Sequence, residues 1–208
     1  TWRVSDGPGN DPGNHHRRGI FSVGGKIYNS RRFAVDWFLR RDGKSVSGDV
    51  HDTRSYYAYG QPVLAVADAR VAVMRDGRPD NIPGPVQTFK TAIPNSMDSV
   101  AGNYIILDLG GGRYAWYLHL RPGSIRVRGG EFVRRGQPMG EIGCSGDSNL
   151  PHLHFEVTTS TQLHAGEGIP YLFDRFAIWK DDRWQSHSRE LPLDRMLVDF
   201  GDVSTGAR

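Results

Sequence analysis

Cysteine is almost absent from this sequence of 208 residues, because Cys144 is the only one. A single thiol excludes an intramolecular disulfide and any zinc site built from paired cysteines. A bound metal ion would therefore need imidazoles and carboxylates, and the chain has 8 histidines and 23 acidic residues. We interpret Cys144 as a structural thiol, since its neighbours predict β-structure rather than the strand-turn-helix elbow of a nucleophile.

Long apolar runs are also lacking. Nothing in the sequence approaches the roughly eighteen consecutive apolar residues that a membrane crossing needs. The first residues do not form the charged and then apolar segment of a signal peptide. Since the chain starts at Thr1 rather than at a methionine, we expect that a leader peptide is absent from this sequence.

Two motifs that would carry other chemistry are missing. The sequence contains no HExxH helix, so the helical route to a zinc peptidase is absent. The glycine-rich residues 110–113 (GGGR) lack the lysine and the following helix of a phosphate-binding loop. A formal charge of +3 comes from scattered arginine pairs, which a solvated surface explains. Because no basic stripe with interleaved aromatic residues occurs, we expect no nucleic-acid partner.

What the sequence does contain is a series of short β-branched and aromatic runs separated by Gly and Pro, which predicts an all-β domain. The predicted strands are residues 31–39, 62–74, 103–110, 114–120, 125–128, 138–143 and 152–157.

Turns and loops account for most of the remaining chain. Residues 1–19 are rich in Gly, Pro, Asn and Asp, which predicts an extended arm or a surface loop. Residues 110–113 should join two strands as a hairpin, and residues 76–99 should form a long loop. Tight Gly-containing turns in residues 125–143 predict a compact, strongly curved antiparallel β-sandwich or barrel.

The most informative motif is His152-x-His154 in an apolar run. Side chains alternate along a strand, so His152, His154 and Glu156 would share one face while apolar residues occupy the other. Two imidazoles on one face either aim at a metal or a reacting group, or mark a half-exposed strand with polar residues outward. Asp36 and His119 also lie in or at the end of predicted strands, and these residue types suit a zinc hydrolase.

Residues 102–157, together with the strand of Asp36 and the YGQPVLAVADARV segment, resemble the core of the lysostaphin-type, or LytM-type, zinc endopeptidases. The resemblance covers roughly residues 29–160. It implies a LytM-like fold of the duplicated hybrid motif type, with long loops. It also implies a zinc-dependent (Zn²⁺) endopeptidase that hydrolyses peptide cross-links of bacterial peptidoglycan by a metal-activated water.

By position, the resemblance makes Asp36 and His154 zinc ligands, and makes His119 and His152 the two catalytic histidines that handle water and oxyanion. The sequence departs from the family at one place. The first ligand of the family is a His four residues before the Asp, and this position holds Arg32. A guanidinium has no available lone pair and stays protonated, so Arg32 cannot bind zinc.

Two consequences of this departure stay open. In one, Arg32 pairs with Asp36, and the chain is a degenerate, metal-free LytM-like domain that binds cell wall or regulates a partner. In the other, a different histidine supplies the third ligand. We place His16 first, because at ~3.3 Å per residue the arm has the reach to return it to Asp36.

Histidines elsewhere in the chain are weaker candidates. His15 and His51 follow His16 in that order, whereas we interpret His164 and His187 as surface residues.

These observations predict three parts: an N-terminal arm (1–28), a LytM-like peptidase domain (29–160) and a C-terminal extension that packs on the core (161–208). We expect the core strands to lie after Lys26. The expected location is extracytoplasmic, either periplasmic or secreted, and the expected partner is peptidoglycan or its peptides. The sequence does not predict an oligomeric state.

Overall fold

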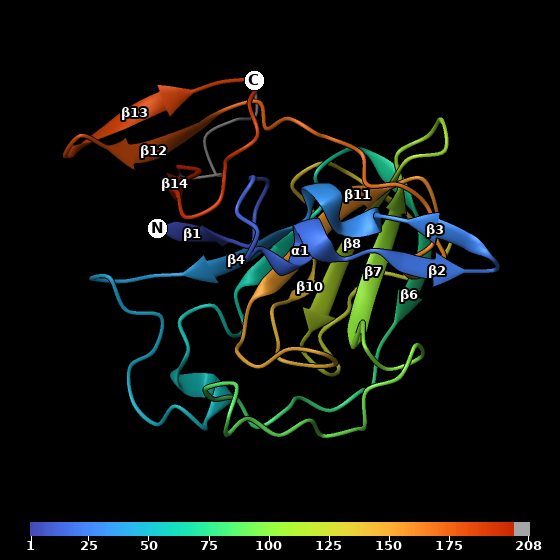
Figure 1. Cartoon of the computed structure of the whole chain (residues 1–208), viewed down its shortest axis with the longest axis horizontal. Helices are drawn as coiled ribbons and strands as arrows, with labels where there is room; N and C mark the ends of the chain where they lie inside the picture. Colours follow the sequence, from blue (N-terminus) through green and yellow to red (C-terminus); the bar gives the residue numbers. More distant parts are fainter. Residues whose placement is uncertain (202–208) are drawn as a thin grey trace.

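The computed structural model describes residues 1–201, and most of its strands join one antiparallel sheet (Figure 1). This sheet has ten strands in the order β13-β12-β14-β1-β4-β11-β8-β7-β6-β9. Their bounds are β1 Trp2–Ser5, β4 Val35–Leu39, β6 Ala69–Arg75, β7 Asn103–Asp108, β8 Tyr114–Leu120, β9 Phe132–Val133, β11 Leu153–Thr158, β12 Phe176–Lys180, β13 Arg183–His187 and β14 Leu197–Asp199.

Four strands form two separate ribbons, and helix is scarce. The ribbons pair β5 (Pro62–Leu64) with β10 (Pro138–Glu141), and β2 (Phe21–Val23) with β3 (Lys26–Tyr28). Helical turns in residues 1–201 are α1 (His15–Arg18), η1 (Ser30–Phe33) and η2 (Thr53–Ser55). In this part of the chain no helix has the length and apolar character that a membrane crossing requires.

The predicted all-β, antiparallel fold is confirmed. The large sheet stays open rather than closing into a barrel, and bulges in the pairings of β6 with β7 and of β7 with β8 bend it. The hairpin at residues 110–113 joins β7 to β8, and residues 76–99 form a long loop, both as predicted. The predicted strand at residues 125–128 is wrong. This segment makes only one backbone hydrogen bond to β10, from the Arg126 N–H to the Met139 carbonyl, which is too few for a β-ladder.

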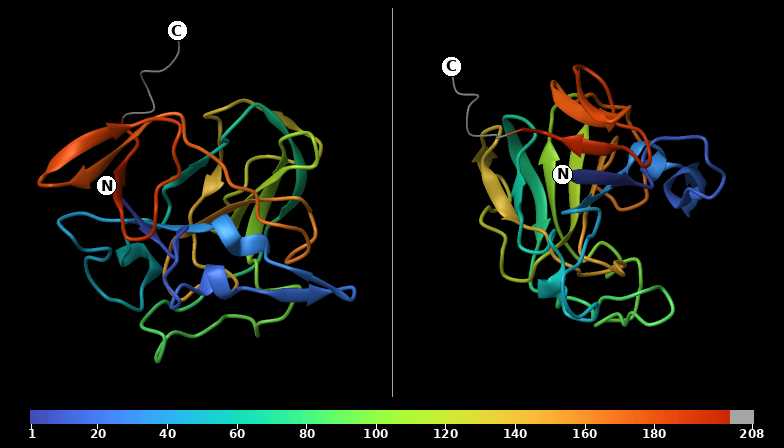
Figure 2. Two further views of the ribbon diagram at one scale, coloured as in Figure 1. Left: turned by 45° about the horizontal axis from the view of Figure 1, so that its top comes forward. Right: turned by 90° about the vertical axis from the view of Figure 1, so that its left-hand side faces the viewer.

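The prediction that the core strands lie after Lys26 is also wrong, because β1 sits inside the sheet. It pairs on one side with β4 and on the other with β14, from opposite ends of the chain. Figure 2 shows β1, in dark blue, beside the red strand β14. Val4 is fully buried in the core. Four residues followed by a Gly- and Pro-rich stretch are too few to display a strand period, which is why the sequence predicted an arm.

The C-terminal extension joins the same sheet. Strands β12, β13 and β14 continue it beyond β1, as expected for added strands that pack on the core. Residues 202–208 of this extension lie outside the described residues. The division into arm, peptidase domain and extension stays a prediction.

Strand β11 separates the core from a polar face, as its alternation predicts. Phe155 and Val157 belong to the main hydrophobic core. On the other face, His154 lies directly across from Asp36 of β4 and from Leu118 of β8. The strand order therefore fixes which side chains meet around His154.

Candidate metal and catalytic centre

The buried carboxylate of Asp36 is the centre of the polar cluster. Its Oδ1 lies 2.9 Å from Nδ1 of His154, the residue across the β4–β11 pairing. On the far side of the His154 ring, Nε2 lies 3.6 Å from Oε2 of Glu156. All three side chains are buried. The register between β4 and β11 is therefore sufficient to bring these three polar residues of the site together.

The N-terminal segment supplies a fourth buried side chain, His16. His16 is 1% exposed, and its Nε2 lies 3.5 Å from Oδ2 of Asp36. Its Nδ1 lies 2.7 Å from the backbone carbonyl of Asp6. Since that nitrogen donates to the carbonyl, the lone pair of Nε2 faces Asp36. The structure thus brings together the three residues expected to bind metal, His16, Asp36 and His154.

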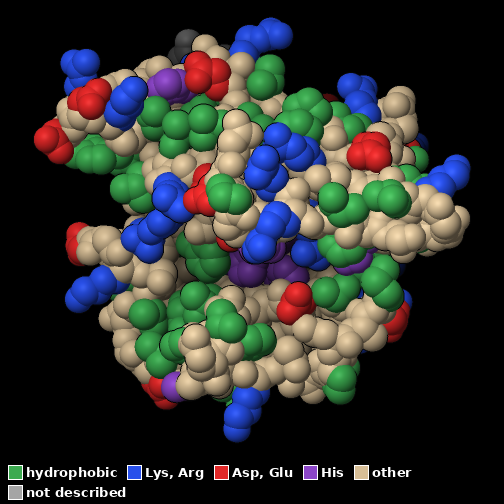
Figure 3. Space-filling model, in the orientation of Figure 1, with side chains coloured by type: hydrophobic (Ala, Val, Ile, Leu, Met, Phe, Trp, Pro, Cys, Tyr) green, Lys and Arg blue, Asp and Glu red, His purple; other side chains and the backbone are tan. Residues whose placement is uncertain are grey.

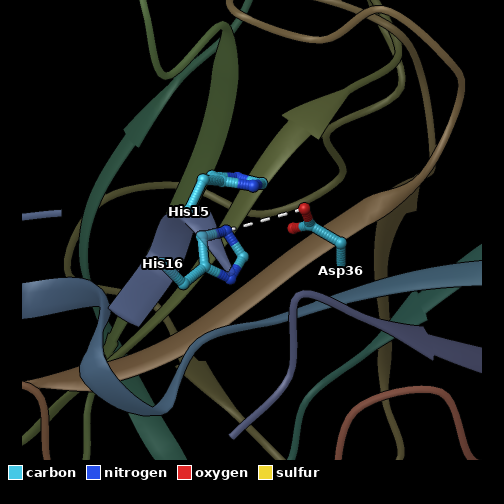
Figure 4. A group of neighbouring side chains, drawn as sticks. All are labelled: His15, His16 and Asp36. Carbon is cyan, nitrogen blue, oxygen red and sulfur yellow. Dashed lines mark ion pairs between the residues drawn. The ribbon is translucent and has the colours of Figure 1, made fainter. Parts of the chain in front are cut away.

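Helix α1 positions His16 by a local cap. The Asn14 side chain accepts from the N–H of Arg17 and donates to the carbonyl of Gly7, and Asn14 itself is buried. This asparagine therefore ties the start of α1 to the segment that follows β1. Figure 4 shows His15 and His16, both from α1, beside Asp36. One ligand atom from each of these three lies within 4.8 Å of the others.

His119 and His152 complete the cluster. The Nδ1 of His119 lies 2.8 Å from the Ser145 carbonyl, and that of His152 lies 2.7 Å from the Leu150 carbonyl. Each Nδ1 is thus the donor, which leaves both Nε2 atoms as acceptors. The two rings are 5.0 Å apart, and Nε2 of His152 is 3.5 Å from Asp36.

A backbone distortion brings His119 to this face. Its φ is +64°, an uncommon conformation for a residue other than glycine. Leu118 belongs to one apolar cluster and Leu120 to the other, although the period of two would place them together. The alternation of β8 therefore breaks at His119, where the ring lies over His152.

A close backbone contact supports this distortion. The N–H of Gly143 donates to the His119 carbonyl, and a Cβ on Gly143 would lie 2.4 Å from the backbone nitrogen of Arg121. We expect Gly143→Ala to lower the free energy of unfolding by about 1–3 kcal/mol, because the two segments would have to separate. Urea denaturation measures this, with Gly129→Ala as the control, since a Cβ there meets nothing within 4 Å. Equal midpoints for the two variants would contradict the prediction.

Burial sets the protonation of His16 and His119. It lowers the pKa of His16 to about 3, and the nearby Asp36 charge only partly opposes this. It also holds the pKa of His119 well below its usual value, reinforced by the histidines beside it. Both rings are therefore neutral near pH 7, which is the form that binds a metal or accepts a proton.

The carboxylates act on His154 in the opposite direction. Burial disfavours its charged form, but hydrogen bonding and charge from Asp36 and Glu156 raise its pKa to about 9. Burial would also raise the pKa of Asp36, yet the surrounding histidines hold it well below its usual value. The neighbouring acidic side chains therefore favour the protonated form of His154, and a metal bound at this ring would compete with its proton.

The site fits a zinc ion. The Nε2 of His16 is buried with no hydrogen-bond partner, although it points at a carboxylate. Two imidazoles and one carboxylate are a common ligand set of catalytic zinc. His16, Asp36 and His154 are the residues that would hold the metal, with Glu156 behind the His154 ring.

Arg32 takes no part in the cluster. Its guanidinium lies over the ring of Phe33, with Cζ 5.2 Å from the centroid. Among residues 1–201, Asp36 forms ion pairs with His16, His152 and His154 but none with Arg32. The ion pair expected for a metal-free domain is therefore not formed.

The remaining histidines lie outside the cluster. His51 is exposed beside Asp49, and His187 pairs with Glu190, with 2.9 Å between Nδ1 and Oε2. The interpretation of His164 as a surface residue is wrong. It is 5% exposed and stacks on Phe21 of β2, with 3.8 Å between ring centroids, because the β2–β3 ribbon covers it.

Sequence reasoning gave no role to Asp6. Its backbone carbonyl orients His16, but a contact through the main chain leaves no mark in the residue type. Glu156 was placed on the same strand face as His154 and also received no role. Glu156 lies two residues after His154, and this spacing is the signal in the sequence that could have assigned it to the site.

Figure 3 shows histidine side chains at the centre of one face of the molecule, in a hollow ringed by other side chains.

Comparison with known proteins relates this chain to one family of peptidases. The model of peptidase family M23 matches residues 51–165, more than half of the chain. These residues include His119, His152 and His154, whereas His16 and Asp36 precede them.

Two curated relatives and one solved structure illustrate the similarity. The chain is 32% identical over 98 residues to the peptidoglycan DD-endopeptidase ShyB of Vibrio cholerae, covering 47% of this chain and 18% of ShyB. It is 35% identical over 74 residues to lysostaphin of Staphylococcus simulans, covering 34% of this chain and 15% of lysostaphin. The solved lysostaphin catalytic domain superposes with a TM-score of 0.43 at 20% identity, over 81% of this chain and 86% of that one. The matched segments span less than a fifth of the two curated relatives.

Proposed function

Because the chain belongs to peptidase family M23, we propose that it is a zinc-dependent endopeptidase that hydrolyses peptide cross-links of bacterial peptidoglycan. The observation that carries the proposal is the buried Asp36 carboxylate between His16 and His154, with His119 and His152 beside it. Such a substrate lies outside the cytoplasm, so the proposed location is periplasmic or secreted.

The proposed ligand set replaces the missing family ligand with a residue from the N-terminal segment. His16 reaches Asp36 from the side of α1, while Arg32 points to Phe33. His16 and His154 thus approach different oxygens of the same carboxylate. These three residues would hold a zinc ion, which would supply a Lewis acid for activating water and polarising the scissile carbonyl.

His119 and His152 would supply the proton chemistry. With each Nδ1 bonded to a backbone carbonyl, each Nε2 is held as an acceptor within the cluster. One of them takes the proton of the attacking water and later returns it to the leaving amine. The other, once it carries a proton at Nε2 as well, would donate a hydrogen bond from that nitrogen to the carbonyl oxygen as negative charge develops there.

The experiment that tests the proposal is a metal analysis joined to an activity assay. Protein purified without chelators should contain about one zinc per chain, as a three-ligand catalytic site holds one ion. It should release peptides from purified peptidoglycan, as detected by mass spectrometry. A chelator should stop the release and added zinc should restore it. Metal-free protein without hydrolytic activity would contradict the proposal and favour the cell-wall-binding or regulatory domain.

A further inference from the structure

A pair of exposed tryptophans lies on the C-terminal hairpin, apart from the residues that the proposed function uses. Strands β12 and β13 form one end of the large sheet, and Trp179 of β12 lies directly opposite Trp184 of β13. Their ring centroids are 5.4 Å apart, with 68° between the ring planes. The two residues are 44% and 41% exposed. Indoles offer a ligand a large apolar area, so an exposed pair of them is a candidate binding surface.

The core of the protein does not use either indole. Phe176 and Ile178, on the opposite face of β12, belong to the main core, whereas neither tryptophan packs against that core within residues 1–201. Strand β14 pairs with β12 at Ala177 and Ile178, so Trp179 lies beyond this pairing. Figure 1 shows the hairpin of β12 and β13 projecting from one side of the molecule. The contact between the two rings therefore stabilises the hairpin alone, and much of their surface stays in contact with solvent.

A tight turn holds the two rings in place. Asp181 and Asp182 join the strands, with φ values of +52° and +56°. Positive φ at both central residues is typical of the two-residue type I′ turn, whose twist matches that of the paired strands. Lys180 and Arg183 lie directly opposite each other on either side of the turn. A ligand would thus meet rings that are already positioned, which lowers the entropic cost of binding.

Polar side chains line an open cleft of about 480 Å³ at the base of the same hairpin. Ser186 and Asp199 lie on either side of Ala177 in the strand register, and all three line the cleft together with Arg175 and Ser188. Alternation places Ser186 and Ala177 on the face of the hairpin that carries the tryptophans. Indole rings can stack on the C–H faces of a sugar, while hydroxyl, carboxylate and guanidinium groups can bond to its hydroxyl and amide groups. The tryptophans and the cleft together have the chemistry of a sugar-binding surface.

We propose that the Trp179–Trp184 face and the cleft beside it bind the glycan strands of peptidoglycan, and that the hairpin holds the enzyme on its polymeric substrate. The choice of this glycan rests on the proposed function, since peptidoglycan joins its peptides to chains of N-acetylated sugars. A lipid membrane suits the surface less well. The four residues between the two tryptophans, 180–183, are all charged and exposed, and inserting the hairpin into lipid would remove these charges from water.

Binding of a soluble oligosaccharide tests the inference separately from catalysis. The probe is chitohexaose, a chain of N-acetylglucosamine that contains no peptide to cut. Calorimetry should show binding to the unmodified chain, and Trp179→Ala and Trp184→Ala should each lower the affinity at least about 10-fold, because a truncated indole leaves most of the contact unmade. Both variants should raise the KM for insoluble peptidoglycan and leave the hydrolysis of a short soluble peptide unchanged. Trp184→Leu keeps an apolar side chain opposite Trp179, so it separates loss of the ring from loss of the hairpin, and it should bind as weakly as Trp184→Ala.

The matched control is Phe132→Ala, since Phe132 is an aromatic residue of β9, the strand at the other end of the sheet, and is 53% exposed. It should keep the affinity and the KM of the unmodified chain. An unmodified chain that does not bind chitohexaose, or tryptophan variants that bind it equally well, would overturn the inference. Tryptophan-dependent binding to vesicles of phosphatidylglycerol and phosphatidylethanolamine in place of the sugar would also overturn it. A chain that binds the sugar through these tryptophans but releases no peptide would support the inference and contradict the proposed hydrolysis.

Discussion

We expect His152→Ala to abolish peptidoglycan hydrolysis and leave zinc in place, whereas His154→Ala should lose both. His154 lies in β11 and His152 immediately precedes the strand, so both side chains are on the same face. Their surroundings differ. His154 presents Nδ1 to Asp36 at 2.9 Å with Glu156 behind it, the arrangement of a ligand. His152 is held by the Leu150 carbonyl and stands beside His119, the arrangement of an acid or base. Loss of proton transfer should lower the rate by about 10²- to 10⁴-fold.

Metal content and peptide release, measured on the same preparations, check this prediction. His51→Ala is the control, because that side chain is exposed and pairs with Asp49 rather than Asp36. Since both histidines of interest are buried, His152→Gln and His154→Gln should be compared as variants closer in volume. Equal zinc loss in the His152 and His154 variants would show that the roles are assigned wrongly.

We expect His16→Ala to lower zinc affinity by at least about 100-fold, more than the 10- to 100-fold typical when only a group behind a ligand is lost. The physical reason is that the buried part of the site then keeps only two ligands, Asp36 and His154, and Arg32 cannot replace the third. Competition with a chelator measures the affinity, and His51→Ala again serves as the control. His16→Gln fills the buried space and tests whether packing alone accounts for the effect.

Removing the whole N-terminal segment would be a poor version of this experiment. Deletion of residues 1–19 also removes β1, and β4 and β14 would then lose a shared partner. Loss of zinc would follow from a disrupted sheet as readily as from a missing ligand. The point variants avoid this, because far-UV circular dichroism should stay unchanged in them. A His16 variant with full zinc occupancy would exclude the N-terminal ligand.

The strand pattern was sufficient to predict one half of the site. Alternation in β11 separates Phe155 from His154, and the register with β4 then places His154 across from Asp36. Local patterns decide such features, so they can be read from the sequence. The reach of the chain also allowed His16 to be ranked above the other spare histidines, although its assignment as a ligand stays a prediction.

Other features depend on contacts that no local pattern records. The place of β1 in the sheet comes from its pairing with β4 and with β14, which lies far along the chain. The position of His119 follows from a positive φ that its contact with Gly143 supports. His164 looked like a surface residue because nothing in its own segment predicts that Phe21 covers it.

The position of β1 between β4 and β14 also bears on the order in which the molecule assembles. During synthesis β1 can pair with β4 early, but its second neighbour, β14, is made only after residues 40–196 have followed. Closing so long a loop costs entropy and slows the last step of folding. In the proposed zinc-bound form, the ion would join the segment after β1 to β4 and β11 before β14 arrives. The metal would then hold these segments together before the sheet is complete. A newly made chain would therefore resist proteolysis in residues 1–19 sooner when zinc is present.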